Sequence, residues 1–321
     1  MTIRKILILA GLIILGLLLL WQWEYGYVPQ TKYKSQTDSS FSVQETIMGT
    51  GKSSLLRPLA VTMDDEGQIY VADSSHHRIM VFDLHNKVVA EIGKPGTGQG
   101  ELDYPTAVGI KGNKLYVGDS TNYRIQVFSK YGDYMYYFPK ETENLGKIKP
   151  VALTLDSQGN VYVADGAGQR ILVFDEQGKF LRSFGKAGND VGEFSFPNGL
   201  ALDEAGQNLY VSDFANGRIQ VFSPEGKFKK KISAEAGFTN PRGLAYNQEQ
   251  KQLYVADIFN HRIVVLNEKG ENLGNVGSIG AGPQQFNFPN GLWYGKGTLL
   301  VADRENNRVM IINTGGSKGK E

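Results

Sequence analysis

The chain has 321 residues, 41% of them hydrophobic, and a formal net charge of +1 at pH 7. This balance lacks the basic excess of a nucleic-acid-binding surface, so we expect no nucleic acid among its partners. The chain contains no cysteine, which excludes disulfide bonds, a thiol nucleophile and a cysteine zinc site.

The first clear signal along the chain is an apolar run near the amino terminus. Arg4 and Lys5 precede this run, which covers residues 6–23 with Gln22 as its one polar interruption. It is long enough to cross a bilayer core, and it ends in aromatic residues of the kind found at membrane interfaces. A cleaved signal peptide has a shorter apolar run that ends in small residues. We therefore expect an uncleaved, single-pass membrane anchor at residues 1–23 that inserts through residues 6–23 and places the rest outside the cytoplasm.

Three further segments follow the expected anchor. Residues 24–40 are polar and lack apolar periodicity, so we expect a linker there. Residues 41–314 carry a repeated apolar pattern and are expected to form one domain. Residues 315–321 form a short polar tail.

The expected domain contains six copies of one pattern. In each copy an apolar strand ends in an aspartate, and five residues later an arginine opens a second apolar strand; successive aspartates are 44 to 48 residues apart. A period of this length predicts one supersecondary unit per copy. The six pairs are Asp73/Arg78, Asp119/Arg124, Asp165/Arg170, Asp213/Arg218, Asp257/Arg262 and Asp303/Arg308.

Each copy reads as four strands. The first begins at a proline and contains small apolar residues, and the next two are apolar at consecutive positions, as in Ile69–Ala72 and Ile79–Phe82, which indicates burial on both faces. The fourth is more polar, as in Lys179–Phe184, and is typical of an exposed edge. Six such units predict an all-β fold, a six-bladed β-propeller. The prolines are Pro58, Pro105, Pro150, Pro197, Pro241 and Pro289.

The two ends of the domain complement each other. The last copy stops near Thr314 after its third strand, while Phe41–Gly49 has the character of a fourth strand. We expect this amino-terminal strand to complete the blade that begins at Pro289 and to close the ring of a monomeric propeller.

Two segments of the repeat resemble a known family. Val71–Ile79 (VADSSHHRI) and Val255–Ile263 (VADIFNHRI) resemble NHL repeats, and the Gly-rich connector Gly93–Gly100 fits the same pattern. The resemblance implies an NHL-type propeller. Propellers with this repeat serve as sensor domains, as docking platforms for protein or RNA and, less often, as lyases, so the resemblance leaves the function open.

Regular and irregular positions of the repeat call for different interpretations. The Asp/Arg pairs recur in every copy, so we interpret them as structural: the aspartate can accept hydrogen bonds from turn amides and the guanidinium can bind its carboxylate. Positions that differ between copies are where a site can be built, because loops on a rigid scaffold carry specificity. In the propeller family the turn after the second strand and the connector before the first open on one face. On that face we predict ligand binding by His76, His77, Tyr123, Phe214, Asn216, Arg242, Ile258, Phe259, His261, Asn290 and Arg304, with Ser74, Asn122 and Glu305 in the same turns. An ordinary solvated rim is the alternative.

A zinc lyase is the most specific enzymatic hypothesis. The peptide-amidating lyase, whose propeller resembles the predicted one, has a histidine directly after the repeat proline in three blades, and these hold zinc. In this chain none of the six residues at that position is histidine, so a three-histidine zinc centre is disfavoured, and we expect no metal, cofactor or catalytic residue. The residues after the prolines are Leu59, Thr106, Val151, Asn198, Arg242 and Asn290.

The leading hypothesis is a membrane-anchored, extracytoplasmic propeller that binds a protein, peptide or glycan on its loop face without catalysis. The alternative is an extracytoplasmic hydrolase or lyase that acts at the central funnel through Asp, Glu or Arg residues. A purely structural component of an assembly is a third class that the residues leave open.

Overall fold

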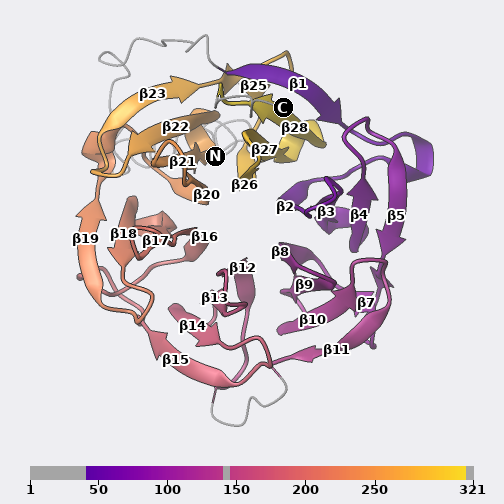
Figure 1. Ribbon diagram of the computed structural model, residues 1–321, viewed down its shortest axis with the longest axis horizontal. Coiled ribbons are helices and arrows are strands. Elements are labelled where there is room, and N and C mark those ends of the chain that lie inside the picture. The colour runs from indigo at the N-terminus through magenta and orange to yellow at the C-terminus, as the bar shows by residue number, and fades with distance from the viewer. Residues whose placement is uncertain (1–40, 140–144, 316–321) are drawn as a thin grey trace, which may run out of the picture. The chain divides into compact units, whose positions relative to one another are not determined.

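The computed structural model describes residues 41–139 and 145–315, which form a ring of six four-stranded antiparallel sheets (Figure 1). The predicted six-bladed β-propeller is confirmed. The predicted anchor at 1–23 and the linker at 24–40 lie outside the described residues. Within the described ranges, no helix is both long enough and apolar enough to span a membrane.

The blades follow one another around the ring, each with its first strand innermost. Blade 1 consists of β2 (Pro58–Met63), β3 (Ile69–Asp73), β4 (Arg78–Phe82) and β5 (Val88–Ile92). Blade 2 consists of β8 (Pro105–Lys111), β9 (Lys114–Asp119), β10 (Arg124–Ser129) and β11 (Tyr134–Phe138). Blade 3 consists of β12 (Pro150–Leu155), β13 (Val161–Asp165), β14 (Arg170–Phe174) and β15 (Phe180–Phe184). Blade 4 consists of β16 (Pro197–Asp203), β17 (Asn208–Asp213), β18 (Arg218–Phe222) and β19 (Phe228–Ile232). Blade 5 consists of β20 (Pro241–Asn247), β21 (Gln252–Asp257), β22 (Arg262–Asn267) and β23 (Asn272–Val276). Blade 6 consists of β26 (Pro289–Gly295), β27 (Thr298–Asp303), β28 (Arg308–Asn313) and β1 (Ser42–Ile47).

The connectors contain short elements of their own. Two connectors form two-stranded parallel ladders, and several turns form single 3-10 helices. These elements are β6 (Lys94–Pro95) with β7 (Glu101–Leu102), β24 (Ser278–Ile279) with β25 (Gln285–Phe286), η1 (Gly51–Ser53), η2 (Ser74–His76), η3 (Phe214–Asn216), η4 (Ala234–Ala236), η5 (Ile258–Asn260) and η6 (Arg304–Asn306).

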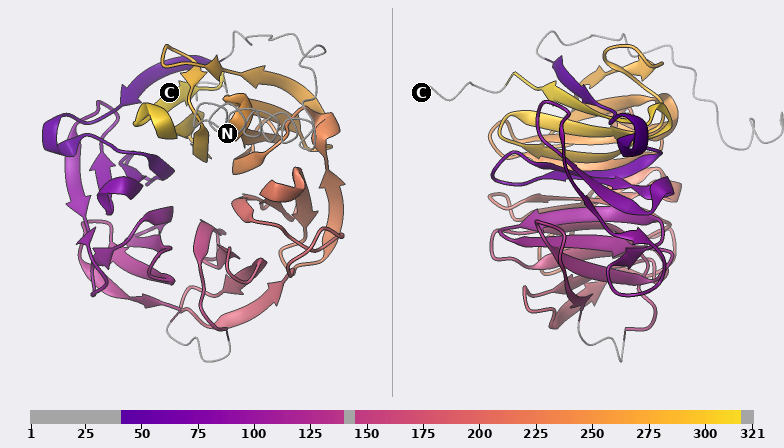
Figure 2. Two further views of the ribbon diagram at one scale, coloured as in Figure 1. Left: turned by 180° about the vertical axis from the view of Figure 1, so that it is seen from behind. Right: turned by 90° about the vertical axis from the view of Figure 1, so that its right-hand side faces the viewer.

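The ring is closed by the amino-terminal strand, as predicted. β1 lies antiparallel to β28, with Ser42 opposite Asn313 and Ile47 opposite Val309, so the sixth blade contains residues from both ends of the domain. Figures 1 and 2 show the indigo β1 as the outer strand beside the yellow β28. The closing strand adds backbone hydrogen bonds where an open edge would otherwise remain.

The core consists of six apolar layers, one between each pair of neighbouring blades. For example, Phe82 and Met80 of blade 1 pack with Ile311 and Val309 of blade 6. Each middle strand is therefore covered on both faces, and every residue of β3 is buried. This arrangement explains why the middle strands are apolar at consecutive positions and do not alternate.

Small residues allow the inner strands to crowd around the axis. A Cβ atom on Gly199 would lie 1.9 Å from the carbonyl oxygen of Arg242 in the next blade, and one on Gly243 would lie 2.0 Å from the carbonyl oxygen of Asn290. Real Cβ atoms do not approach an oxygen so closely. Blades 4 and 5 therefore approach their neighbours more closely than a side chain would permit.

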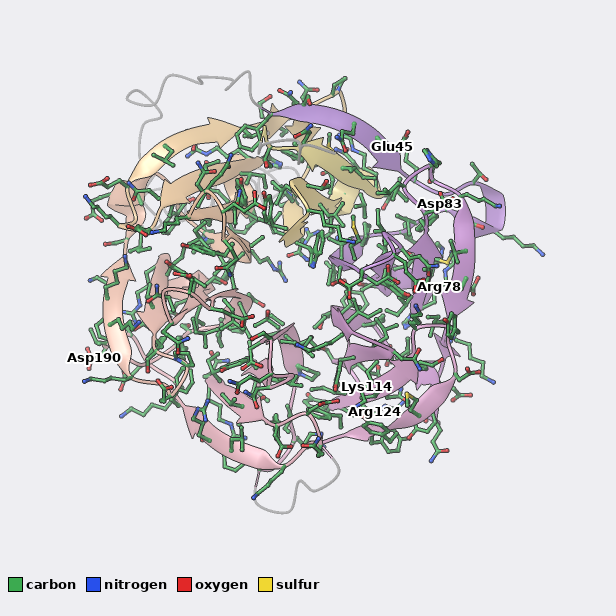
Figure 3. The ribbon with its side chains drawn as sticks, viewed as in Figure 1. Glu45, Arg78, Asp83, Lys114, Arg124 and Asp190 are labelled. Carbon is green, nitrogen blue, oxygen red and sulfur yellow. The ribbon has the colours of Figure 1, made fainter. Side chains whose placement is uncertain are left out.

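Each repeated Asp/Arg pair forms hydrogen bonds with the backbone of the connector that precedes the first strand of its own blade. In blade 1, Oδ2 of the buried Asp73 accepts a hydrogen bond from Nε of Arg78 at 2.8 Å, while Oδ1 accepts the N–H of Leu56 at 2.7 Å. The arginine then donates from Nη2 to the carbonyl oxygen of Ser54. The Nε–Oδ2 bond forms in all six blades, at 2.7 to 3.2 Å. In Figure 3, Arg78 and Arg124 lie within their blades and away from the central opening, so the pairs form no charged ring around the axis.

Candidate binding face

The predicted site positions come together at one end of the blades. In each blade the repeat proline pairs with the repeat aspartate, as Pro197 pairs with Asp213. The residues after the prolines therefore lie beside the turns that follow the aspartates. We call this end of the ring the upper face, defined by residues 74–77, 120–123, 166–169, 214–217, 258–261 and 304–307.

Several predicted binding residues are committed to the scaffold. Nδ2 of Asn216 donates to both carboxylate oxygens of Asp213 and to the carbonyl oxygen of Gly188. His76 occupies the same place in its repeat and lies 2.9 Å from Asp73 through Nδ1. Asparagine stands at this position in four of the six copies, a recurrence that indicates a structural role. Ile258 is only 1% exposed, so the prediction that it contacts a ligand is wrong: the residue after the aspartate turns into the core here.

The last residue of four of these turns links neighbouring blades. His77 accepts the backbone N–H of Tyr104 through Nδ1 at 3.1 Å, and His261 accepts that of Phe288 in the same way. Both histidines have positive φ angles, 57° and 53°, which direct the side chain toward the next blade. Burial lowers the pKa of His261, and the nearby Asp303 opposes this shift. The neutral imidazole that results is suited to accept a hydrogen bond at Nδ1.

The upper face surrounds a cavity at the end of the central channel. The cavity has a volume of about 100 Å³, and the residues that follow the repeat prolines form its wall, including Arg242, Asn198 and Asn290. A ring of aliphatic side chains, one from the fourth position of each inner strand, forms its floor and separates it from a second cavity of about 280 Å³. The ring consists of Val61, Val108, Leu153, Leu200, Leu244 and Leu292.

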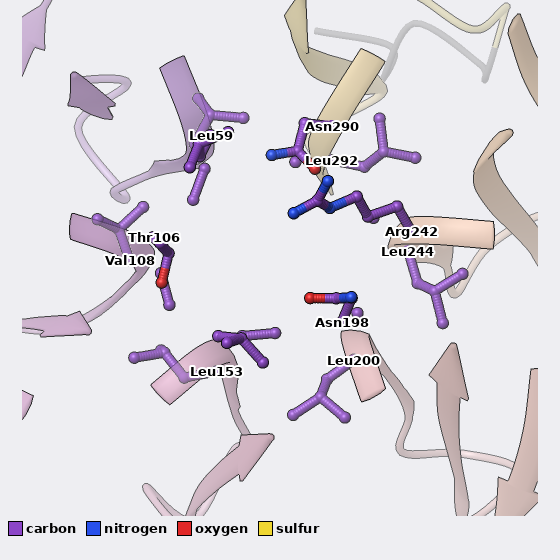
Figure 4. Close-up of a pocket in the computed structure, with 18 residues that line it drawn as sticks. Leu59, Thr106, Val108, Leu153, Asn198, Leu200, Arg242, Leu244, Asn290 and Leu292 are labelled. Carbon is purple, nitrogen blue, oxygen red and sulfur yellow. The ribbon is translucent and has the colours of Figure 1, made fainter. Parts of the chain in front are cut away.

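Of the described residues that line the upper cavity, Arg242 is the one that is ionisable. Its side chain extends into the middle of the cavity between Asn290 and Asn198 (Figure 4). No hydrogen bond or ion pair joins the guanidinium to a residue in the described part of the chain; its neighbour is the ring of Phe214, 5.8 Å away. Burial lowers the pKa of Arg242 to about 10, and the charge of Arg304 adds to the shift. The group remains a cation at neutral pH.

Three aromatic side chains form a continuous ridge beside this cavity. The ring centroids of Phe214 and Phe259 are 6.0 Å apart, and those of Phe259 and Phe288 are also 6.0 Å apart. Phe259 is 54% exposed, the other two are half-buried, and Arg304 lies over Phe288 at 5.1 Å. We call Phe214, Phe259 and Phe288 the aromatic ridge.

A charge cluster borders the ridge and the cavity. The Oε1 atom of Glu305 accepts hydrogen bonds from Nη2 of Arg57 at 2.7 Å and from Nε of Arg304 at 2.8 Å. Burial alone would raise the pKa of Glu305, but the two arginines lower it overall. One carboxylate thus faces two arginines, and Arg242 adds a third positive charge nearby.

The remaining predicted residues are not part of the ridge. Tyr123 is 43% exposed in blade 2, where Nζ of Lys147 lies 5.4 Å from its ring. Phe288 and Phe196, the latter 58% exposed, were not among the residues predicted from the sequence. Both directly precede a repeat proline, and the residue at this position differs between copies, which is a sequence signal for the same face.

The central channel contains few groups suited to acid–base catalysis. Within residues 41–139 and 145–315, Arg242 is the ionisable residue that lines the upper cavity, and Glu204 is the carboxylate that lines the lower one. Among the described residues, no three His, Cys, Asp or Glu side chains are grouped so that they could hold a metal ion.

Comparison with protein families agrees with the repeat and the fold. Residues 55–82 match the family model of the NHL repeat, and residues 108–240 match that of a family described as a 6-bladed beta-propeller. None of the curated proteins compared matches the chain.

Solved structures share the fold at low sequence identity. A catalytically inactive virginiamycin B lyase from Staphylococcus aureus with quinupristin is 16% identical, with a TM-score of 0.61 over 85% of this chain and 99% of that one. A structural genomics protein of unknown function from Bacteroides thetaiotaomicron is 17% identical, with a TM-score of 0.64 over 85% of this chain and 76% of that one. A chain of a nidogen/laminin complex is 19% identical, with a TM-score of 0.56 over 68% and 79% of the two chains. At these identities the likeness is one of fold.

Proposed function

We propose that the chain is a non-catalytic binding module that takes a protein, peptide or glycan ligand on its upper face. We further propose that residues 1–23 anchor it in the cell membrane, with the propeller on the extracytoplasmic side. The observation that carries the binding proposal is the aromatic ridge with Arg304 and Arg242 beside it.

The composition of this surface supports recognition. Phenylalanine and arginine are enriched at protein interfaces, and residues that contribute most to binding cluster beside pockets from which water is excluded. Phe259 is a large apolar side chain in water, and its contacts with Phe214 and Phe288 make it part of a patch. A rigid ring of blades holds this patch, so little conformational entropy is lost when a ligand binds.

The hydrolase or lyase alternative has weaker support. General acid–base catalysis needs titratable groups that reach the same substrate atoms. The upper cavity offers Arg242, whose pKa of about 10 keeps the proton on the guanidinium near neutrality. The lyase among the structural neighbours shares the fold, and a fold does not specify a reaction.

Capture of partners by the immobilised full-length chain tests the binding proposal. We expect specific partners from a cell-envelope extract, identified by mass spectrometry, to be lost when Phe214 and Phe259 are both replaced by alanine. The matched control replaces Leu181 and Leu273 by alanine, since these are exposed apolar residues on the outer strands β15 and β23. Equal capture by both double variants, with unchanged melting temperatures, would contradict a site on the ridge.

The location is tested separately. We expect the full-length chain to remain with membranes after alkaline carbonate extraction, and the propeller to be cleaved by protease added outside intact cells. Release of the chain by carbonate, or full protection from the protease, would contradict the anchored, extracytoplasmic arrangement.

A further inference from the structure

We propose that the upper cavity binds the carboxylate of an acidic peptide segment, with the guanidinium of Arg242 as the anion-binding group. This inference rests on the proposed function, because it names the group by which a ligand on the upper face would enter the channel. The peptide backbone and its apolar side chains would lie over the aromatic ridge.

The isolation of Arg242 is the first argument. A guanidinium carries five N–H donors, and taking a charged group out of water is costly unless a partner of opposite charge is present. The described residues provide the Arg242 guanidinium with an aromatic ring but no acceptor or carboxylate. The arginines of the repeated Asp/Arg pairs behave differently: the guanidinium of Arg218, for instance, binds Asp213 and two backbone carbonyl oxygens. The donors of Arg242 therefore face the cavity and are available to a ligand.

The neighbouring amides are the second argument. Asn290 is only 5% exposed, and none of the described residues forms a hydrogen bond with its side chain. Asn198 donates to the carbonyl oxygen of Phe196 at 3.2 Å and has a second amide hydrogen left over. Figure 4 shows both amides on either side of the Arg242 guanidinium. An oxyanion in the cavity can accept a fork of two hydrogen bonds from the arginine and further ones from these amides.

The surrounding charge favours an anion. Arg304 and Arg57 share one carboxylate, Glu305, so the charge cluster has an excess of positive charge even without Arg242. Repulsion from Arg304 contributes to the lowered pKa of Arg242. A bound carboxylate would relieve this repulsion, and its attraction to the arginine would be strengthened by the lower dielectric of this half-buried site.

The size and walls of the cavity favour a peptide carboxylate over an acidic sugar. The cavity, at about 100 Å³, is smaller than the pockets of about 300–1,000 Å³ that enclose most of a drug-sized ligand. Such a space suits a carboxylate and the methylene groups that carry it. The aliphatic side chains at the fourth position of the six inner strands, such as Leu153 and Leu200, provide an apolar floor for these methylene groups. A pyranose ring is wider and carries hydroxyl groups that this floor cannot satisfy.

Four probes test the proposal with the full-length protein and isothermal titration calorimetry. The first is the blocked tripeptide acetyl-Phe-Glu-Phe-amide, and the second replaces its glutamate with glutamine. The third is acetyl-Phe-Phe with a free terminal carboxylate, and the fourth is a hyaluronan tetrasaccharide. We expect the glutamate peptide to bind at least about tenfold more tightly than the glutamine peptide. The third probe distinguishes a terminal carboxylate from a side-chain carboxylate as the source of the anion.

Two variants test whether the preference for the glutamate peptide arises in the upper cavity. We expect Arg242→Gln to remove the difference between the glutamate and glutamine peptides. Lys251→Gln, which removes one charge from the β20–β21 hairpin of the same blade at the other end of the ring, should preserve it. We also expect the melting temperature of Arg242→Gln to be unchanged or raised, because the variant removes a half-buried charge without a partner. A large loss of stability would show a structural role for Arg242 and overturn the proposal.

The outcomes separate this inference from the proposed function. Equal affinity for the glutamate and glutamine peptides, together with no binding of the dipeptide that has a free terminal carboxylate, overturns the carboxylate site. Binding of the tetrasaccharide that is lost in Arg242→Gln overturns the assignment to a peptide. In each case, partner capture that depends on Phe214 and Phe259 would still support a binding module. Conversely, capture that does not depend on these two residues would contradict the proposed function and would leave the measured preference for the glutamate peptide intact.

Discussion

Nδ1 of His261 accepts the backbone N–H of Phe288 at 3.1 Å, so a side chain of the fifth blade fixes the connector of the sixth. Equivalent contacts join three other pairs of blades, where the acceptors are His77, Gln169 and Asn307. In the two remaining blades the position holds Tyr123 and Gly217. A position that looks variable in the sequence is thus restricted, in four blades, to side chains that can accept a hydrogen bond.

This contact predicts a pH dependence of stability. Burial lowers the pKa of His261 below its ordinary value of 6.5, so the unfolded chain binds the proton at a higher pH than the folded one. The stabilisation that comes from keeping His261 neutral is complete above pH 6.5, and it is lost as the pH falls toward the pKa of His261 in the folded protein. We expect His261→Asn to melt with a weaker pH dependence than the wild type between pH 7.5 and 5.5, because asparagine tolerates the positive φ and remains an acceptor. Parallel curves for the two proteins would contradict the prediction.

Removal of one repeated aspartate should have a large effect. Asp213 is fully buried and accepts hydrogen bonds from Arg218, Ser195, Asn216 and Gln220. Asp213→Asn would leave the Arg218 guanidinium buried without its counter-charge, and we expect a loss of about 3–5 kcal/mol in the free energy of unfolding. Guanidinium chloride titration measures this loss. The control is Lys251→Gln, which breaks an exposed ion pair and should cost at most about 1 kcal/mol. Similar losses in the two variants would argue against a structural role for the Asp213/Arg218 pair.

The last residue of the closing strand and the residue that follows it have opposite environments. Ile47 is fully buried in the layer between blades 6 and 1, whereas Met48 is 49% exposed. We expect Ile47→Ala to reduce the free energy of unfolding by about 2–4 kcal/mol, because it leaves a cavity in that layer. Met48→Ala should change it by less than about 0.5 kcal/mol. A negligible effect of Ile47→Ala would mean that the packing of the closing strand between blades 6 and 1 contributes little to stability.

The close approach of the inner strands can be tested at one glycine. A Cβ on Gly243 would meet the carbonyl oxygen of Asn290 at 2.0 Å, so we expect Gly243→Ala to lower stability by about 1–3 kcal/mol through displacement of the backbone. The control is Ala152→Gly at the equivalent position of blade 3, with an expected loss of about 0.5–1 kcal/mol from chain entropy. Thermal unfolding of both variants provides the comparison, and a Gly243→Ala variant as stable as the wild type would refute the tight contact.

The fold was predictable from the sequence because its causes are periodic. The repeated aspartate and arginine marked the blades, and the unmatched strand at Phe41–Gly49 indicated the closing partner of the last copy. The binding face was harder, because a turn position does not reveal where its side chain points. Asn216 turns back to Asp213 and Ile258 enters the core, while the isolation of Arg242 depends on blades that lie on either side of it in space.

The pairing of β1 with β28 also has a consequence for how the protein is made. Ser42 is synthesised 271 residues before its partner Asn313, which at about 5–20 residues per second is a delay of roughly 14 to 54 s. Through this interval the nascent chain carries a strand whose backbone donors and acceptors are unpaired. Such a strand can pair with other nascent chains, and the charged Glu45 in its middle makes that outcome less favourable.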